Sequence, residues 1–326
     1  MQRVVMQERP GWRQQAQSLG FRFHSIGGEP YWDESVRYRF TLPQIESGIE
    51  QPTREIHELC VDLVSRAVRD DEYLRRLALP ECFWDLIRSS WVRSEPHLYG
   101  RMDFAYDGEN PLHFASVRDS IEDRATVEYL EDLARQAGIR TTYVAMEDVG
   151  RTADGHYTDC DDNVIEAIFK LYPWEFLFAD EFSRYLRSAA ATWFEPPWKS
   201  ILSNKGALAL LWELHPQHPN LLPAFFETQE EKASALPCGW VRKPLFSREG
   251  ANVELVTLQG EHLEAPGPYT DFPYVRQAFH ALPKFTDSYA LIGSWVIGDQ
   301  AAGIGVREDR SLITRDTARF VPHVLI

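Results

Sequence analysis

Residues 112–146 read LHFASVRDSIEDRATVEYLEDLARQAGIRTTYVAM, and this stretch decides the fold of the first part of the chain. It opens with an apolar run, Leu112–Val117, that is typical of a strand. Asp119–Gln136 has the spacing of an amphipathic helix, with inward-facing residues predicted at Val127, Leu130, Leu133 and Ala134. Arg140–Met146 predicts a second strand. Such a β-α-β run is typical of a parallel, Rossmann-like sheet.

Three other segments of the first 195 residues have helical character. Residues 51–75 predict a helix, with Thr53 as its candidate N-cap. Cys82–Val92 predicts a second, short helix. Asp161–Leu171 predicts a third.

The character of the sequence changes near residue 195. Phe194–Trp198 reads FEPPW, which predicts a boundary or a rigid turn. Lys205–Leu214 predicts a helix, and half-buried antiparallel strands are then expected at Trp240–Leu245, Val253–Leu258, Tyr274–Ala281, Tyr289–Ile297 and Ala302–Arg307. The sequence therefore predicts an α/β N-terminal region followed by a β-rich C-terminal region of α+β type.

Composition narrows the possible functions. The chain has 326 residues and a net charge of −15, with 44% hydrophobic and 25% charged residues. These proportions are typical of a globular protein. The negative charge argues against a general binder of nucleic acid or of anionic membranes, because both need a basic face. A local basic site for phosphate remains compatible with this balance.

The cysteines and the apolar runs bear on where the protein resides. Cys60, Cys82, Cys160 and Cys238 are far apart, which argues against a disulfide framework or a structural zinc site and fits a reducing compartment. The N-terminus has no apolar run of the signal-peptide kind, and no stretch of 18 apolar residues occurs. We expect a cytoplasmic protein.

The segment Val241–Val253, VRKPLFSREGANV, carries the strongest chemical signal. It places Lys243 on a strand and Arg248 and Gly250 in the loop that follows. A glycine loop between strands can direct backbone N–H groups at a phosphate, and nearby cations neutralise its charge. Taken alone, however, the segment fits an ordinary β-hairpin with a surface basic pair somewhat better.

Two more segments have a phosphate-related and a structural interpretation. Lys199–Lys205 precedes a helix that Ser203 or Asn204 would cap, which puts Lys205 near an anion-attracting N-terminus. Taken alone, an ordinary cap with solvated lysines is the commoner case. Gly305–Thr314 is dense in charge. It could gather acidic metal ligands beside a phosphate-facing arginine, or form a charged hairpin turn.

Acidic residues earlier in the chain allow the same two interpretations. Arg101 and Asp103 lie two apart, so on a strand they would share one face and could bind phosphate and a divalent cation. A structural ion pair is the more frequent outcome. Asp119, Glu122 and Asp123 begin a helix, where the helix dipole favours acids in any case.

These pieces, in this order, resemble the glutathionylspermidine synthase-like group of ATP-grasp ligases, and most closely its short, stand-alone bacterial members. The resemblance rests on Tyr31–Ser35, Tyr99–Phe104, Phe169–Glu175, Glu195–Lys205, Val241–Val253, Leu282–Lys284, Ile292–Trp295, Gly305–Asp309 and Arg319–His323. It implies an α+β chain with a Rossmann-like pre-ATP-grasp and substrate region over residues 1–195. An ATP-grasp nucleotide-binding region over residues 196–326 would follow.

The resemblance also implies a reaction and its cofactors. ATP phosphorylates a carboxylate, an amine attacks the acyl phosphate, and Mg²⁺ assists. The partners are a small-molecule or peptide carboxylate and an amine, with neither nucleic acid nor membrane. By this resemblance the catalytic residues are Arg101, Arg248 and Arg307, the metal ligand is Asp103, and the substrate residues are Glu122 and Asp123. The nucleotide residues are Arg101, Met102, Asp103, Lys205, Lys243, Gly250, Gln277, Leu312, Ile313 and Thr314.

The sequence departs from this family in one large respect. Relatives have several dozen residues between the region of Asp107 and the strand at Leu112, and these contain two further magnesium ligands. Here Gly108–Pro111 runs straight into that strand. With Asp103 as the only ligand left, the metal site would be incomplete. Either the chain is a non-catalytic nucleotide-binding protein, or the sequence omits residues of an intact ligase. A phosphotransferase is a third alternative.

The substrate pocket departs as well. Leu171 and Phe176 replace hydroxyl residues of the relatives, and Arg319 stands where the spermidine-using enzymes have an acid. A cation there would repel a polyamine. The sequence therefore predicts an amine ligase without identifying its acid and its amine.

Overall fold

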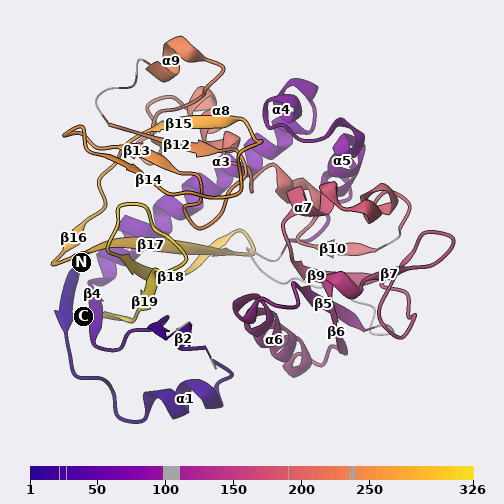
Figure 1. Ribbon diagram of the computed structural model, residues 1–326, viewed down its shortest axis with the longest axis horizontal. Helices are drawn as coiled ribbons and strands as arrows, with labels where there is room; N and C mark the ends of the chain where they lie inside the picture. Colours follow the sequence, from indigo (N-terminus) through magenta and orange to yellow (C-terminus); the bar gives the residue numbers. More distant parts are fainter. Residues whose placement is uncertain (22, 27, 98–110, 190, 235, 237–238) are drawn as a thin grey trace. The chain divides into compact units, whose positions relative to one another are not determined.

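The computed structural model describes residues 1–326 except residues 22, 27, 98–110, 190, 235 and 237–238 (Figure 1). The chain divides into two compact units. Unit 1 comprises Met1–Arg9, Ser25–Glu81 and Ile201–Ile326, and unit 2 comprises Pro10–His24 and Cys82–Ser200. Among the described residues, no helix has both the length and the apolar character needed to cross a membrane.

Unit 2 is built on the predicted β-α-β run. Strand β5 (Leu112–Ser116) is followed by α6 (Ile121–Gln136) and by β6 (Thr141–Ala145), and β5 and β6 pair in parallel. The Ser120 hydroxyl caps α6 by accepting the Asp123 N–H at 3.2 Å. The prediction of a parallel β-α-β unit is confirmed.

The buried face of α6 is narrower than predicted. Val127 and Ala134 are buried and Leu130 packs against the same core, but Leu133 is 38% exposed. Residues 127, 130 and 134 follow the i, i+3, i+7 spacing of a single stripe, and position 133 lies beside it. Glu131 is buried instead, where its carboxylate pairs with Arg135.

The predicted helix at Asp161–Leu171 is wrong. Its last residues form strand β9 (Ala167–Leu171), which lies between β5 and the edge strand β10 (Thr192–Phe194) in an all-parallel sheet of order β10-β9-β5-β6. Ile168, Phe169 and Lys170 are all buried. A central strand buried on both faces gives a short continuous run, which periodicity alone does not distinguish from a helix.

The other elements of unit 2 are short. The helices are α1 (Trp12–Ser18), α5 (Trp84–Val92) and α7 (Trp174–Ala179), and strands β7 (Gly150–Arg151) and β8 (Tyr157–Thr158) form a hairpin. Helix α5 confirms the predicted helix at Cys82–Val92.

Unit 1 contains three larger sheets. The first has the order β1-β4-β20, the second β11-β15-β12-β13-β14 and the third β16-β17-β18-β19. The second and third are antiparallel throughout, as predicted for the C-terminal strands. The strands are β1 (Gln2–Val5), β2 (Ser25–Ile26), β3 (Glu29–Pro30), β4 (Val36–Phe40), β11 (Ala224–Phe226), β12 (Trp240–Pro244), β13 (Glu254–Val256), β14 (His262–Glu264), β15 (Tyr274–Ala278), β16 (Lys284–Phe285), β17 (Ser288–Ile297), β18 (Gln300–Asp309), β19 (Arg319–Val321) and β20 (His323–Leu325).

The predicted helix over residues 51–75 is two helices. The helices of unit 1 are α2 (Leu42–Ile45), α3 (Gln51–Ala67), α4 (Asp71–Arg76), α8 (Gly206–Leu214) and α9 (Glu230–Ser234). The helix is interrupted between α3 and α4 at Asp70, because the Asp70 carboxylate accepts the Glu72 N–H and caps α4. Thr53 is not an N-cap, since a π-helical turn, Glu46–Glu50, leads into α3 and the Thr53 hydroxyl donates to the Ile49 carbonyl.

Unit 1 combines residues from both sides of position 195, where the sequence predicts a boundary. Strand β4 comes from the first part of the chain, yet it pairs in parallel with β20 at the C-terminus. Val36, Tyr38 and Phe40 of β4 share one core cluster with Ala290 and Val306 of the third sheet. Unit 1 therefore draws on both predicted regions.

A buried carboxylate joins these strands of unit 1. Glu308 on β18 accepts hydrogen bonds from Arg3 at 2.6 Å, from the Tyr38 hydroxyl at 2.6 Å and from Arg319 at 2.8 Å. Burial by itself would raise the pKa of Glu308, but these donors outweigh it and lower the pKa. Burial and the bond to Glu308 raise the pKa of Tyr38.

Replacing this carboxylate should cost unit 1 much of its stability. Glu308→Ala leaves Arg3 and Arg319 without their buried partner, so we expect a loss of about 3–5 kcal/mol in the free energy of unfolding, measured by urea denaturation. Glu264→Ala, on the exposed face of β14, is the control and should change it by less than about 0.5 kcal/mol. An equal effect of both substitutions would contradict the role of Glu308.

The same network predicts a pH dependence. Because the folded-state pKa of Glu308 is lowered, its contribution is complete above the usual glutamate pKa of about 4.3 and is lost as the pH falls through the lowered value. The stability difference between the wild type and Glu308→Gln should shrink over that acidic range in denaturation curves. A constant difference would contradict this assignment.

Candidate active site

Strands β12 and β15 bring two of the predicted nucleotide residues together. Val241 pairs with Gln277 and Lys243 pairs with Val275, so all four side chains share one face of the sheet. The Lys243 ammonium donates to Gln277 Oε1 at 2.8 Å.

The ammonium group of Lys243 is partly desolvated. The side chain is half-buried, and burial lowers the pKa of its ammonium. Its hydrogen-bond acceptor is the neutral amide oxygen of Gln277, and it forms no ion pair with a carboxylate of the described residues. A buried cation without an anionic partner is costly, so this position favours a bound anion.

Lys205 lies against the segment that continues from β12. Asn204, one of the two predicted caps, accepts the Gly206 N–H at 2.7 Å at the start of α8. The Lys205 N–H donates to the Leu245 carbonyl at 2.8 Å, and its ammonium donates to the Ser247 carbonyl. The Ser247 hydroxyl is buried and has no partner among the described residues. Residues 205 and 243–247 thus form one local group.

Gly250 is packed against the 312–314 segment. Its φ is +75°, and an added Cβ would lie 2.7 Å from Ile313 Cγ2 and 2.9 Å from the Thr314 carbonyl oxygen. Ile313 and Leu312 also belong to an apolar cluster with Val241. The structure therefore places the glycine loop, the Lys243 strand and Leu312–Thr314 beside one another.

Asp309 anchors that segment. Its carboxylate accepts the Ser311 N–H at 2.8 Å, the Arg315 N–H at 2.9 Å and the Arg315 guanidinium at 3.2 Å. Burial by itself would raise the pKa of Asp309, but these donors lower it. The sequence offered Gly305–Thr314 as a possible source of metal ligands, but Glu308 and Asp309 use their carboxylates to hold the fold. The spacing Asp-x-Ser, typical of an Asx turn, is the signal for this role.

The remaining predicted residues fall into three groups. Arg307 lies on β18 in unit 1, with its guanidinium 5.9 Å from the centre of the Phe320 ring, and Arg248 is exposed in the glycine loop. Glu122 and Asp123 belong to unit 2. Arg101, Met102 and Asp103 lie outside the described residues.

Glu122 and Asp123 lie where α/β sheets bind ligands. Both are in the first turn of α6, directly after the carboxyl end of β5. The chain runs from β5 to β6, its neighbour on one side in the sheet. From β9 it runs to β10, which lies toward the opposite edge of the sheet. The connections therefore change direction between β5 and β9, and ligands of open parallel sheets bind at such a point, outside the carboxyl ends of the strands.

The described residues contain no cluster of three or more His, Cys, Asp or Glu side chains able to hold a metal ion. The predicted ligand Asp103 is not among them. Cys60, Cys82 and Cys160 form no disulfide bond with one another, and Cys238 lies outside the described residues.

The close approach at Gly250 gives a paired prediction. Gly250→Ala should destabilise unit 1 and weaken nucleotide binding, because the new Cβ meets Ile313 and Thr314 in a left-handed backbone conformation. Gly260→Ala is the matched control, since Gly260 has φ +84° and nothing within 4 Å of an added Cβ. Thermal melting with and without ATP measures both effects.

The control should show only the backbone cost, about 1 kcal/mol. Equal losses of stability and of ATP-induced stabilisation in the two variants would mean that the contact with the 312–314 segment has no effect.

Comparison with known proteins identifies the family. The family model described as "Glutathionylspermidine synthase preATP-grasp" matches residues 3–112 and 109–326. The chain belongs to the glutathionylspermidine synthase family, as the sequence motifs predicted.

Its relatives are ligases that join carbon and nitrogen. A Haemophilus influenzae protein provisionally named an acid–amine ligase is 34% identical over 98% of both chains. A trypanothione synthetase of Crithidia fasciculata is 27% identical over 80% of this chain and 52% of its own. The bifunctional glutathionylspermidine synthetase/amidase of Escherichia coli is 22% identical over 97% and 63%. Family membership places the chain among the acid–amine ligases.

Solved structures are less similar. A D-cycloserine synthetase matches 65% of this chain and 75% of its own at 14% identity, with a TM-score of 0.38.

The matches also show a difference in length between this chain and a relative. The family model matches in two pieces that meet at residues 109–112. The alignment with the Haemophilus influenzae relative spans 390 positions, although this chain has 326 residues. The relative thus has several dozen residues without a counterpart in this sequence. That they lie between Asp107 and Leu112 stays a prediction.

Proposed function

We propose that this chain is an ATP- and Mg²⁺-dependent carboxylate–amine ligase. It forms an amide through an acyl phosphate, with an ATP-grasp nucleotide site in residues 196–326 and a pre-ATP-grasp region in residues 1–195. One observation carries the nucleotide site: the half-buried Lys243 has a lowered pKa and no carboxylate partner among the described residues.

The surrounding residues fit a nucleoside triphosphate. Lys205 donates to the Ser247 carbonyl, four residues after Lys243 in the chain, and the N-terminus of α8 adds a positive dipole end. Gln277, Leu312 and Ile313 offer an amide and apolar surface for the base. These are the groups that hold phosphates and a flat ring in nucleotide sites.

When bound, ATP supplies the phosphoryl group that activates the carboxylate. The part of this chain is to bind and orient. Lys205 and Lys243 hold phosphate oxygens, while Arg248 and Arg307 neutralise negative charge that develops during transfer. Phosphoryl transfer depends mainly on positioning and on concentrated positive charge, so no covalent nucleophile is needed.

The requirement for Mg²⁺ rests on the family and on Asp103. The described residues provide no metal cluster, so the structure adds no further ligand to it. We therefore assign no step of the reaction to the ion.

The amine is proposed to bind near Glu122 and Asp123, at the carboxyl edge of the parallel sheet. Arg319, the cation expected to repel a polyamine, has its charge compensated by Glu308 at 2.8 Å and Asp33 at 3.2 Å. Its repulsion of an amine is therefore weaker than the sequence predicts.

The direct test measures ADP release by the full chain with ATP, Mg²⁺ and a matrix of amines and peptide carboxylates, with amide products identified by mass spectrometry. A ligase should release ADP only when acid and amine are both present. Binding of ATP without ADP release under any pair would instead indicate a nucleotide-binding member that the missing segment has inactivated. Release of ADP with a lasting phosphorylated product and no amide would indicate a phosphotransferase.

Lys243→Met tests the nucleotide site independently of the substrates. It should abolish the thermal stabilisation by ATP, which for the wild type at a hundred times Kd is about 2.7 kcal/mol. Where turnover is found, it should fall about a hundredfold or more. Lys232→Met, on the exposed face of α9, is the control and should retain both.

The lowered pKa of Lys243 predicts the behaviour without nucleotide. Between the lowered pKa and the usual lysine value of about 10.4, the unfolded chain binds a proton that the folded chain does not. The stability of the nucleotide-free wild type relative to Lys243→Met should therefore rise with pH over this range. A relative stability that falls there would contradict the desolvation of Lys243.

A further inference from the structure

The buried residue Ser247 lies beside Lys205 in the proposed nucleotide site. Its side chain is only 8% exposed, and its hydroxyl forms no hydrogen bond with the described residues. An unpaired hydroxyl in a buried position is costly, and such groups are rare in folded proteins. This hydroxyl therefore fits a partner that the described part of the chain does not supply.

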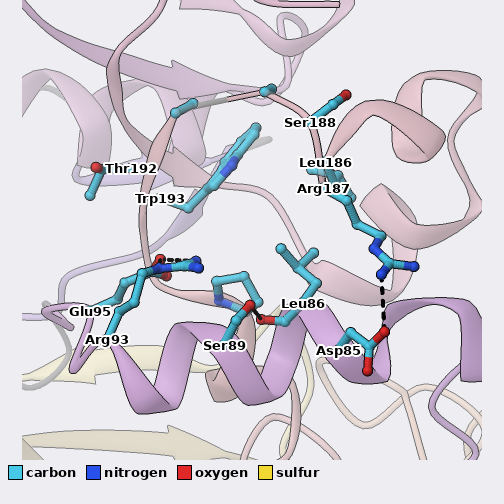
Figure 2. A pocket seen from close by; sticks show the side chains of 13 residues that line it. Asp85, Leu86, Ser89, Arg93, Glu95, Leu186, Arg187, Ser188, Thr192 and Trp193 are labelled. Carbon is cyan, nitrogen blue, oxygen red and sulfur yellow. Dashed lines mark hydrogen bonds and ion pairs between the residues drawn. The ribbon is translucent and has the colours of Figure 1, made fainter.

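The buried serines elsewhere in the described chain are all paired. Ser90 of α5 accepts the Trp198 N–H at 3.0 Å. Its half-buried neighbour Ser89, which lines a cavity of about 570 Å³ in unit 2, donates to the Leu86 carbonyl at 3.0 Å (Figure 2). The other buried serines that form hydrogen bonds are Ser116, Ser200 and Ser288. Burial alone therefore does not explain the unpaired hydroxyl of Ser247.

Two lysines give the surroundings of Ser247 a positive charge. The Ser247 carbonyl accepts a hydrogen bond from the Lys205 ammonium, and Lys243 precedes Ser247 by four residues. The Lys205 N–H also donates to the Leu245 carbonyl at 2.8 Å, so two contacts hold Lys205 against residues 245–247. Cations next to a hydroxyl favour an anionic oxygen as its partner.

Main-chain donors are present in the loop that begins at Ser247. The N–H groups of Ser247 and Gly250 donate to no acceptor in the part of the chain that the structure describes. Glu249 and Gly250 have φ values of +54° and +75°. Turns of this kind can direct N–H groups at an anion. A phosphate has enough oxygens to accept from N–H, hydroxyl and ammonium donors together.

We propose that the Ser247 hydroxyl binds a phosphate oxygen of the nucleotide, together with Lys205 and Lys243. The inference rests on the proposed function and adds a ligand to its nucleotide site. The hydroxyl is shielded from solvent in the structure, whereas Arg248 and Glu249 are exposed. Binding therefore includes a shift of this exposed loop that lets the phosphate reach the hydroxyl. The phosphate then accepts the hydrogen bond that the described residues do not.

This role predicts opposite effects on the chain alone and on its nucleotide complex. Ser247→Ala removes an unpaired buried group, so the nucleotide-free variant should melt at the temperature of the wild type or above it. The variant also lacks a phosphate ligand, so its Kd for ATP should rise about tenfold or more, or about 1.4 kcal/mol. A hydroxyl that only supported the fold would lower the melting temperature instead.

The test combines thermal melting of the full chain without nucleotide and isothermal titration calorimetry with ATP and Mg²⁺. The matched control is Ser90→Ala, a buried serine whose hydroxyl donates to the Ile87 carbonyl at 2.8 Å. This control should lower the melting temperature, because it leaves the Trp198 N–H without its acceptor. Its Kd for ATP should equal that of the wild type.

Three results would contradict the proposal, and they differ in what else they affect. An unchanged Kd for ATP in Ser247→Ala would overturn the role of the hydroxyl and leave the proposed function intact. A melting temperature lowered as far as in Ser90→Ala would do the same, because the hydroxyl would then support the fold. Absence of saturable ATP binding to the wild type up to about 10 mM would overturn the nucleotide site itself and this proposal with it.

Discussion

The hydrogen-bonded carboxylate of Glu308 is the constraint on which unit 1 depends. Its three donors come from β1, β4 and β19, so a single side chain on β18 fixes both ends of the chain to the third sheet. Successive residues of a strand face opposite sides, and the next residue, Asp309, turns away from this core to hold the 311–315 segment. That segment packs against Gly250 and the Lys243 strand. The proposed nucleotide site is therefore supported from the same strand that anchors the core.

This arrangement explains why the sequence was more informative about local elements than about units. The β5-α6-β6 run was predictable because its strands, cap and helix stripe are local, and the antiparallel C-terminal strands followed from alternation. The pairing of β4 with β20 was not predictable, because it joins residues at opposite ends of the chain. Strand β9 was missed for a different reason, since it is buried on both faces and has no alternation to read.

In the candidate site, too, local features could be predicted from the sequence and contacts between distant residues could not. Lys243 and Gly250 stood out in the sequence, because a lysine on a strand followed by a glycine loop has a chemical meaning at short range. That Lys243 contacts Gln277, and that Gly250 meets Ile313 and Thr314, depends on strand register and on the turn held by Asp309. The sequence allowed Glu308 and Asp309 to be metal ligands, because it did not show which arginines would pair with them. Those pairs depend on the fold and not on spacing along the chain.

The predicted break near residues 109–112 bears on the fold and on the proposed nucleotide site in different ways. Strand β5 begins at Leu112, whose N–H donates to the Arg140 carbonyl at 2.9 Å, so the described strand starts directly after this position. Lys205, Lys243, Gly250 and the 312–314 turn belong to unit 1, where their described contacts are with Leu245, Ser247 and Gln277 and with one another. If the chain binds a nucleotide as proposed, it does so with residues of unit 1 that lie outside the segment near residues 109–112.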